Sequence, residues 1–215
     1  MPKLRVHNFA VSLEGYGAGP AQSLEDPLGV GGEGLHEWAI ETRSFKAMHG
    51  DGAGGKTGID DDMIARGNEN IGSWILGRNM FGAVRGPWPN DEWKGWWGPN
   101  PPYHCDVFVL THHARASIRM EGGTTFHFVI DGIHSALDKA FAAAGGKDVR
   151  VGGGVATVRA YLAARLVDEM HVAVSPVLLG GGEHLFTGLD LPKLGYECAA
   201  PVRSAVAAHF FVTKK

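Results

Sequence analysis

Short apolar runs alternate with helical segments through the middle of the chain. The runs at 107–110, 126–130, 149–151 and 170–174 are predicted strands, and 134–144 and 155–166 have the apolar spacing of helices. Before them, the pattern predicts a strand at 5–13, a helix at 35–45, a helix starting at 60–62 and a strand at 74–76. After them come two strand-like segments, around Tyr196 and at 205–212, with no helix between them. This order predicts an α/β fold whose sheet is parallel in the middle and antiparallel at the end.

Composition narrows the possible partners. The 215 residues are 44% hydrophobic and 20% charged, with a net charge of -3 and no Lys/Arg cluster, so a nucleic-acid surface is not expected. No apolar run approaches a membrane span, and the N-terminus lacks a secretory h-region. Cys105 and Cys198 are expected to be reduced thiols. We expect one soluble, cytoplasmic domain over residues 1–215, with small molecules as its partners.

One motif matches a phosphate-binding pattern but lies in the wrong context. Gly50 to Thr57 reads GDGAGGKT, which satisfies GxxxxGK[ST] and would place Lys56 on nucleotide phosphates and Thr57 on magnesium. Such a loop needs a buried strand before it and a helix that begins at the Lys-Thr pair. Residues 44–49 do not form a strand pattern, and Gly58 follows Thr57 directly. A flexible surface loop is the preferred interpretation, and an ATP- or GTP-binding loop is the less favoured alternative.

A glycine turn between a strand and a helix is the best candidate for chemistry. Gly152, Gly153 and Gly154 follow the strand at 149–151, so their backbone N–H groups and the next helix N-terminus are suited to an anion. Arg78 follows the strand at 74–76, and Thr111, His113 and Arg115 follow the strand at 107–110. Ligands of open α/β sheets bind outside the carboxyl ends of strands, so these groups predict an extended, phosphorylated ligand. A tight turn without a ligand is the alternative for the glycines, and a solvated loop charge for Arg115.

Five segments in the same order resemble the dihydrofolate-reductase-like family that includes the riboflavin-biosynthesis reductase domain. They are residues 8–15 (NFAVSLEG), 76–81 (LGRNMF), 109–112 (VLTH), 151–154 (VGGG) and 174–180 (VSPVLLG). The resemblance spans nearly the whole chain. It implies a three-layer fold with a mixed, mainly parallel sheet between helices, NADPH as hydride donor, a heterocyclic substrate of pterin-like or ribosylaminopyrimidine-like type, and a homodimer. No deaminase zinc motif is present, so a bifunctional deaminase-reductase is not expected.

The resemblance also assigns site residues. The first strand and its turn, including Ala10, Val11 and Gly17, would cover the nicotinamide, and Gly152, Gly153, Gly154, Val155 and Thr157 would hold the pyrophosphate. Gly77, Arg78 and Asn79 would contact the phosphates on the adenosine side, and Thr111, His112 and His113 would border the adenosine. Cations at Arg78, His113 and Arg115 favour NADPH over NADH, because a 2′-phosphate requires them.

The substrate side departs from the family pattern at two positions. Glu14 replaces an expected Asp, and Met80 stands where many relatives carry a hydroxyl. Glu14 is the candidate for proton relay or substrate orientation, with turn stabilisation as the alternative. Asn8, Glu37 and Trp96 are candidate substrate contacts, and His36 lies next to Glu37. Trp88, Trp93, Trp96 and Trp97 lie in a proline-rich loop at 86–103, suited to a lid, a wall or a dimer contact. No metal site is expected, because the histidines lack ligand spacing.

Two functions remain open on these grounds. The first is an NADPH-dependent reductase. The second is a protein of the same fold that binds the nucleotide without turnover, which the departures at Glu14 and Met80 keep open.

Overall fold

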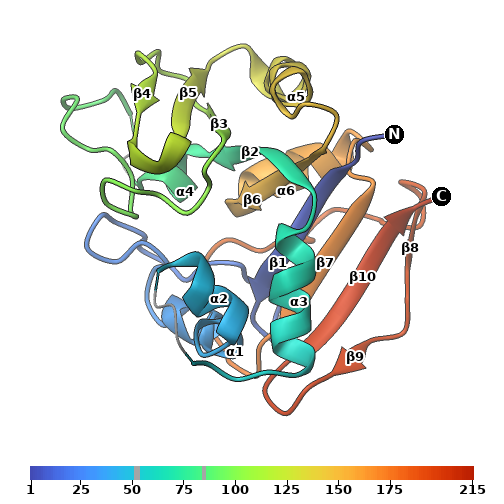
Figure 1. Cartoon of the computed structure of the whole chain (residues 1–215). Coiled ribbons are helices and arrows are strands. Elements are labelled where there is room, and N and C mark those ends of the chain that lie inside the picture. The colour runs from blue at the N-terminus through green and yellow to red at the C-terminus, as the bar shows by residue number, and fades with distance from the viewer. Residues whose placement is uncertain (51–53, 84–85) are drawn as a thin grey trace.

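The computed structural model describes residues 1–50, 54–83 and 86–215, and Figure 1 shows their arrangement. The helices are η1 (Gly32–Leu35), α1 (Glu37–Ile40), α2 (Arg43–Met48), α3 (Ile59–Asn68), α4 (Arg78–Phe81), η2 (Glu121–Gly123), α5 (Gly132–Ala143) and α6 (Val155–Ala163). The strands are β1 (Leu4–Val11), β2 (Ile71–Gly77), β3 (Asp106–Leu110), β4 (Ile118–Arg119), β5 (Thr125–Val129), β6 (Asp148–Gly153), β7 (Glu169–Val174), β8 (Tyr196–Cys198), β9 (Val202–Arg203) and β10 (Ala208–Lys214).

All of these strands belong to a single sheet in the order β4-β5-β3-β2-β6-β1-β7-β10-β8, with β9 paired to β10. The six strands from β5 to β7 are parallel to one another, whereas β10 runs antiparallel to β7, β8 and β9, and β4 antiparallel to β5. The predicted α/β fold, with a mainly parallel sheet and antiparallel C-terminal strands, is confirmed. The parallel strands bring six carboxyl ends to one edge of the sheet.

The two faces of the sheet are covered differently. Val172 and Met170 pack with α5 and α6 in the main apolar core, while Ala173 packs with Trp38 of α1 and Ile64 of α3. Because neighbouring strand residues point to opposite faces, α5 and α6 lie on one face and α1 and α3 on the other. In Figure 1, α3 crosses in front of β1 and β7, with α1 and α2 beside it.

Buried arginines fix the C-terminal end of α3 on the sheet. Arg5 of β1 donates to the carbonyls of Arg66 and Glu69, and Arg150 of β6 donates to the carbonyl of Gly67. Cations at a helix C-terminus satisfy its last carbonyl groups and complement its dipole. The N-terminal end of α3, with Asp60 in its first turn, therefore points toward the carboxyl edge of the strands.

The predicted helix at 35–45 is wrong as a continuous element. The segment forms η1, α1 and α2, and the break falls at Thr42, which has extended backbone (φ -73°, ψ 151°). The side chain of Thr42 accepts a hydrogen bond from the N–H of Phe45 and caps α2, a role that hydroxyl residues favour over a place in mid-helix. Leu35, Trp38, Ala39 and Thr42 of this segment are all buried.

Other differences are small. The first strand ends at Val11 rather than at residue 13, the last begins at Ala208 rather than 205, and α6 ends at Ala163 rather than 166. The short elements α4, β4 and β9 were not predicted, because two to four residues carry no detectable periodicity.

The phosphate-loop motif at residues 50–57 lies partly outside the described residues, because 51–53 are not among them. The residues that flank it lack the required context. Helix α2, rather than a strand, precedes Gly50, and α3 begins at Ile59 after Gly58. Lys56 pairs with Thr42 in a short β-bridge, and its N–H donates to the carbonyl of Glu41.

Candidate functional site

The glycine turn after β6 lies directly against the end of β2. A side chain at Gly77 would collide with Thr157 Oγ1 and the backbone nitrogen of Gly154, so only a glycine fits there. Gly154 is the N-cap of α6 and no side chain caps it, while the space in front of its Cα is open. The N–H groups of the first turn of α6 are therefore available to an anion.

Two further predicted residues join this cluster, one from the turn after β1 and one from α4. Gly17 packs so closely on Val155 and Phe9 that a Cβ would lie 2.8 Å from both side chains, and its N–H donates to the carbonyl of Glu183. The Asn79 amide lies 3.5 Å from Glu183 Oε1. The turn after β1, the end of β2 and the start of α6 are thus neighbours, as the resemblance implied.

The ends of β2 and β3 are joined through Arg78. Its Nη1 donates to Thr111 Oγ1 at 3.3 Å, and the same hydroxyl accepts the N–H of His113. Nε and Nη2 of Arg78 are buried and have no hydrogen-bond partner among the described residues. Burial lowers the pKa of Arg78, and the nearby charge of Arg115 lowers it further. An anionic ligand would satisfy both the open N–H groups and the unbalanced charge.

The alternative interpretation of Arg115 as a solvated loop charge is wrong. Its side chain is 3% exposed, its Nε lies 3.3 Å from Asp91 Oδ1, and its Nη2 donates to the carbonyls of Asp91 and Trp93. These bonds hold the tryptophan-containing loop at 86–103, so Arg115 is part of the scaffold around Arg78.

The tryptophan loop, as we call residues 86–103, contains no helix or strand and packs as a wall beside this site. Trp88 and Trp93 pack on a second apolar cluster that contains Phe81, Val107 and Phe126. Their indole N–H groups donate to the carbonyls of His113 and Phe81, at 2.9 Å and 2.8 Å. Trp96 lies edge-on to Trp93, and Trp97 packs on His49, which follows α2. These contacts favour the wall over the lid, and the possible dimer contact stays untested.

Glu14 links the turn after β1 to the loop after β7. Its carboxylate accepts the N–H groups of Leu179 at 2.8 Å and Gly180 at 3.1 Å, and the Ser12 hydroxyl at 3.1 Å. The hydrogen bond from Leu179, assisted by those from Gly180 and Ser12, lowers the pKa of Glu14 below its usual value. A carboxylate held ionised in this way orients two loops and is poorly suited to donate a proton.

Some predicted residues lie apart from this cluster. Asn8 forms a β-bulge with φ 57° under α3, where its amide bonds the carbonyl of Met63 and the guanidinium of Arg150. Glu37 is exposed at the start of α1, and His112 is exposed after β3. Ala10 and Val11 are buried at the end of β1, where they pair with Ala173 and Val174 of β7.

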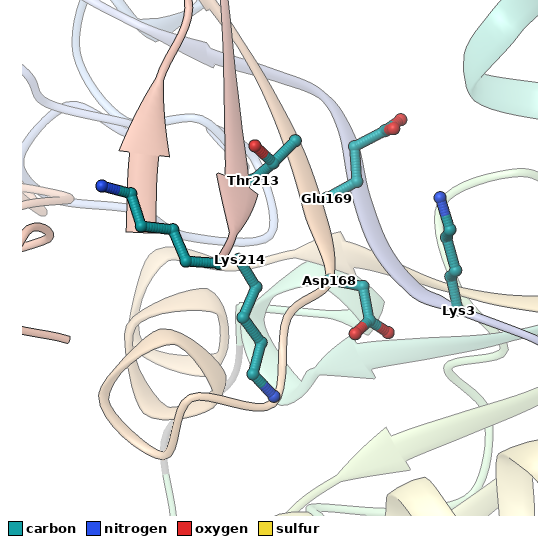
Figure 2. Close-up of a pocket in the computed structure, with 6 residues that line it drawn as sticks. Lys3, Asp168, Glu169, Thr213 and Lys214 are labelled. Atoms are coloured by element: carbon teal, nitrogen blue, oxygen red, sulfur yellow. The ribbon is translucent and has the colours of Figure 1, made fainter. Parts of the chain in front are cut away.

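Two surface hollows lie at the opposite, amino edge of the parallel strands. One of about 360 Å³ is lined by Lys3, Asp168, Glu169, Thr213, Lys214 and Lys215, most of which Figure 2 labels. The other, of about 350 Å³, shares Lys3 and Glu169 with it. Their acids are already engaged, since Asp168 accepts the N–H of Leu4 and Glu169 accepts from His7. These hollows are separate from the predicted site.

Sequence reasoning missed Glu183, and it gave Trp88 only as a member of the tryptophan loop. Glu183 lies between Asn79 and Gly17, and Trp88 lies against Arg78, whose Cζ is 3.3 Å from the indole ring centre. No local pattern in the sequence predicts that Glu183 reaches the end of β2. Within the described residues, no group of three or more His, Cys, Asp or Glu side chains is placed to hold a metal ion. None of the described helices is long and apolar enough to cross a membrane.

Comparison with known proteins identifies the family. The model of the RibD C-terminal domain matches residues 3–205, nearly the whole chain. The fold is similar to a protein assigned to riboflavin biosynthesis from Shewanella sp. PV-4, with 19% identity, a TM-score of 0.58, and 100% of this chain and 99% of that chain covered. It is also similar to Acinetobacter baumannii RibD, with 15% identity, a TM-score of 0.56, and 100% of this chain on 58% of that chain.

A third similar structure is the Thermotoga maritima diaminohydroxyphosphoribosylaminopyrimidine deaminase/5-amino-6-(5-phosphoribosylamino)uracil reductase. The identity is 12%, the TM-score 0.54, and 100% of this chain matches 57% of that one. No curated protein sequence matches the chain.

The strand order, the glycine turn and the family match together define the class, a dihydrofolate-reductase-like α/β domain. The chain belongs to the RibD C-terminal domain family.

Proposed function

We propose that this protein is an NADPH-dependent reductase that transfers a hydride to a pterin-like or ribosylaminopyrimidine-like heterocycle. The observation that carries the proposal is the convergence of three strand ends. The glycine turn with the start of α6, the Gly77–Asn79 segment and the Thr111–His113 segment meet at one edge of the sheet. Family membership supports the same activity.

The residues present fit a dinucleotide. Gly77 leaves room beside the backbone nitrogen of Gly154, which a side chain would fill. Arg78 holds two buried N–H groups that have no partner among the residues that the structure describes. The strand order β3-β2-β6-β1 then sets the direction of the ligand. With the pyrophosphate at the end of β6, the residues at the ends of β2 and β3 would hold the adenosine, and Gly17 and the end of β1 would border the nicotinamide.

NADPH supplies the hydride when bound, and the protein supplies position and electrostatics. The first turn of α6 and Arg78 bind negative charge, and Thr111 holds Arg78. Glu14 fixes the turn after β1 against Leu179 and Gly180, which shapes the wall next to the nicotinamide position. We assign to Glu14 the role of orienting these two loops. Water is assigned as the donor of the proton that accompanies reduction of the substrate. Trp96, in the tryptophan loop, and Glu37, exposed at the start of α1, are the proposed substrate contacts.

The test is a pair of measurements on the purified chain. Titration with NADPH, NADH and ATP-Mg, followed by tryptophan fluorescence, is expected to give tightest binding for NADPH. Absorbance then reports NADPH oxidation with dihydropterins and with a ribosylaminopyrimidine. Tight ATP-Mg binding that is lost in Lys56→Ala would overturn the proposal in favour of the phosphate loop.

The second candidate is a nucleotide-binding protein without turnover. It is favoured by the full engagement of the Glu14 carboxylate by backbone N–H groups, which leaves it poorly placed to relay protons. NADPH binding with no oxidation in the presence of any tested heterocycle would select this candidate. The homodimer remains a proposal, and sedimentation of the purified chain tests it.

A further inference from the structure

Trp88 lies next to two arginines at the adenosine end of the proposed cofactor site. The Cζ atom of Arg78 is 3.3 Å from the ring centre of Trp88, and that of Arg115 is 4.8 Å from it. The indole N–H donates to the carbonyl of His113 at 2.9 Å, which fixes the plane of the ring. Arg78 thus has one face of its guanidinium covered by an immobilised aromatic ring.

Arg115 holds Trp88 in place through the loop backbone. The Nη2 atom of Arg115 is already engaged within the protein, because it donates to the carbonyls of Asp91 at 2.9 Å and Trp93 at 2.7 Å. The guanidinium is also packed near Phe81 and Phe128, with the Cζ atom 5.8 Å and 5.2 Å from their ring centres. Removing it would free the segment of the tryptophan loop that carries Trp88.

Part of the donor edge of Arg78 is unsatisfied. Nη1 donates to Thr111 Oγ1 at 3.3 Å, whereas Nε and Nη2 are buried and have no hydrogen-bond partner within the described part of the chain. A buried charged donor without an acceptor is costly, so an anion at this edge gains the energy of charge-assisted hydrogen bonds. A free arginine side chain would lose rotamer entropy when it binds an anion, and stacking on Trp88 removes much of that loss beforehand.

We propose that Trp88 is a positioning residue that holds Arg78 for the 2′-phosphate of the dinucleotide, and that Arg115 in turn holds Trp88. This inference rests on the proposed function, because it requires a nucleotide whose adenosine lies at the ends of β2 and β3. The preference for a phosphorylated ribose then depends on the stacking of Arg78 on Trp88 of the tryptophan loop, and not on Arg78 alone.

The experiment compares 2′,5′-ADP with 5′-AMP by calorimetric titration of the full chain. The ratio of the two affinities reports on the 2′-phosphate alone, because general loosening of the site would weaken both nucleotides alike. Trp88→Ala is expected to weaken the binding of 2′,5′-ADP about tenfold, which corresponds to about 1.4 kcal/mol, and to change the binding of 5′-AMP less than about twofold. Trp88→Phe retains a ring and is expected to keep most of the preference, and Arg115→Gln is expected to lose it partly.

Trp97→Ala is the matched control, since Trp97 lies in the same loop but packs on His49 and Tyr103. It is expected to leave the affinity ratio unchanged. A Trp88→Ala protein that keeps the wild-type ratio would overturn the inference and leave the proposed function standing. A wild-type chain that does not distinguish 2′,5′-ADP from 5′-AMP would overturn the NADPH assignment itself. Should Trp88→Ala not fold, a wild-type ratio in Arg115→Gln overturns the inference in its place.

Discussion

The two sides of the proposed cleft are built in different ways. The dinucleotide side, comprising the ends of β2, β3 and β6 with the start of α6, is made of local strand-turn-helix units. The first-turn side, residues 12–17 after β1 with the loop at 175–184 after β7, is held by contacts between distant parts of the chain. Glu14 bonds Leu179 across 165 positions, and Ser175 bonds the carbonyl of Leu35 across 140. The proposed cofactor-binding part is thus encoded locally, and the part proposed to face the substrate is encoded by tertiary contacts.

Acidification is expected to give the largest effect on stability. It acts on buried histidines of the sheet face beneath α3, next to the first-turn side. His171 is fully buried, where it accepts the N–H of Asn8 and bonds His209, which in turn bonds Asp60. Burial lowers the pKa of His171 to about 2, and the positive charges of Arg150 and Arg66 and the nearby His7 and His209 act in the same direction. Unfolded chains bind this proton below about pH 6.5 and the folded chain does not, so stability falls as pH falls.

The unfolding free energy is therefore expected to drop by about 3 kcal/mol between pH 7.5 and pH 4.5 from His171 alone. Urea unfolding at several pH values measures it. His171→Phe should flatten this slope, while His112→Ala, at an exposed position on the dinucleotide side, should keep it. An equal slope in both variants would show that the acid sensitivity lies elsewhere.

Gly77→Ala probes the closest approach on the dinucleotide side. Its Cβ would collide with Thr157 Oγ1 and the Gly154 nitrogen, so we expect a loss of about 1–3 kcal/mol in unfolding free energy together with weaker NADPH binding. Gly181→Ala is the control, because a Cβ there meets nothing within 4 Å. Thermal unfolding and fluorescence titration report the two effects. Unchanged NADPH affinity in a folded Gly77→Ala protein would argue against a ligand at this junction.

Ala156→Asp separates binding from folding. Ala156 is exposed in the first turn of α6, where an added carboxylate favours the helix but repels a bound phosphate. NADPH affinity is expected to fall about tenfold with no loss of stability, and Ala156→Asn should bind almost normally. This position is a cleaner probe than Gly153, whose φ of 145° would strain any side chain. If Asp and Asn bind NADPH equally, the first turn of α6 does not face the phosphates.

Glu14→Gln is expected to have the smallest catalytic effect. Removal of a general acid or base costs roughly a hundredfold or more in rate, whereas loss of an orienting carboxylate should cost less than about tenfold and leave the pH profile of kcat in place. The shorter Glu14→Asp variant should lie between wild type and Glu14→Gln. A large loss of kcat with a displaced pH profile would restore Glu14 as the proton relay.

Much of the fold was predictable because its strands and helices are local patterns. The central strands and α3, α5 and α6 follow from apolar periodicity and from glycine or acidic boundaries. The break at Thr42 was not predictable, since it depends on a hydroxyl cap and on the pairing of Thr42 with Lys56. Similarly, Arg115 has the sequence context of a surface charge, and only the packing of the tryptophan loop buries it.

Hydrogen exchange of the full chain with and without NADPH tests the central claim most directly. The account predicts slower exchange at the amides of residues 154–157 after β6, with further protection at 77–79 and 111–113. Protection confined to residues 50–57, or to the amino edge around Lys3 and Asp168, would contradict it.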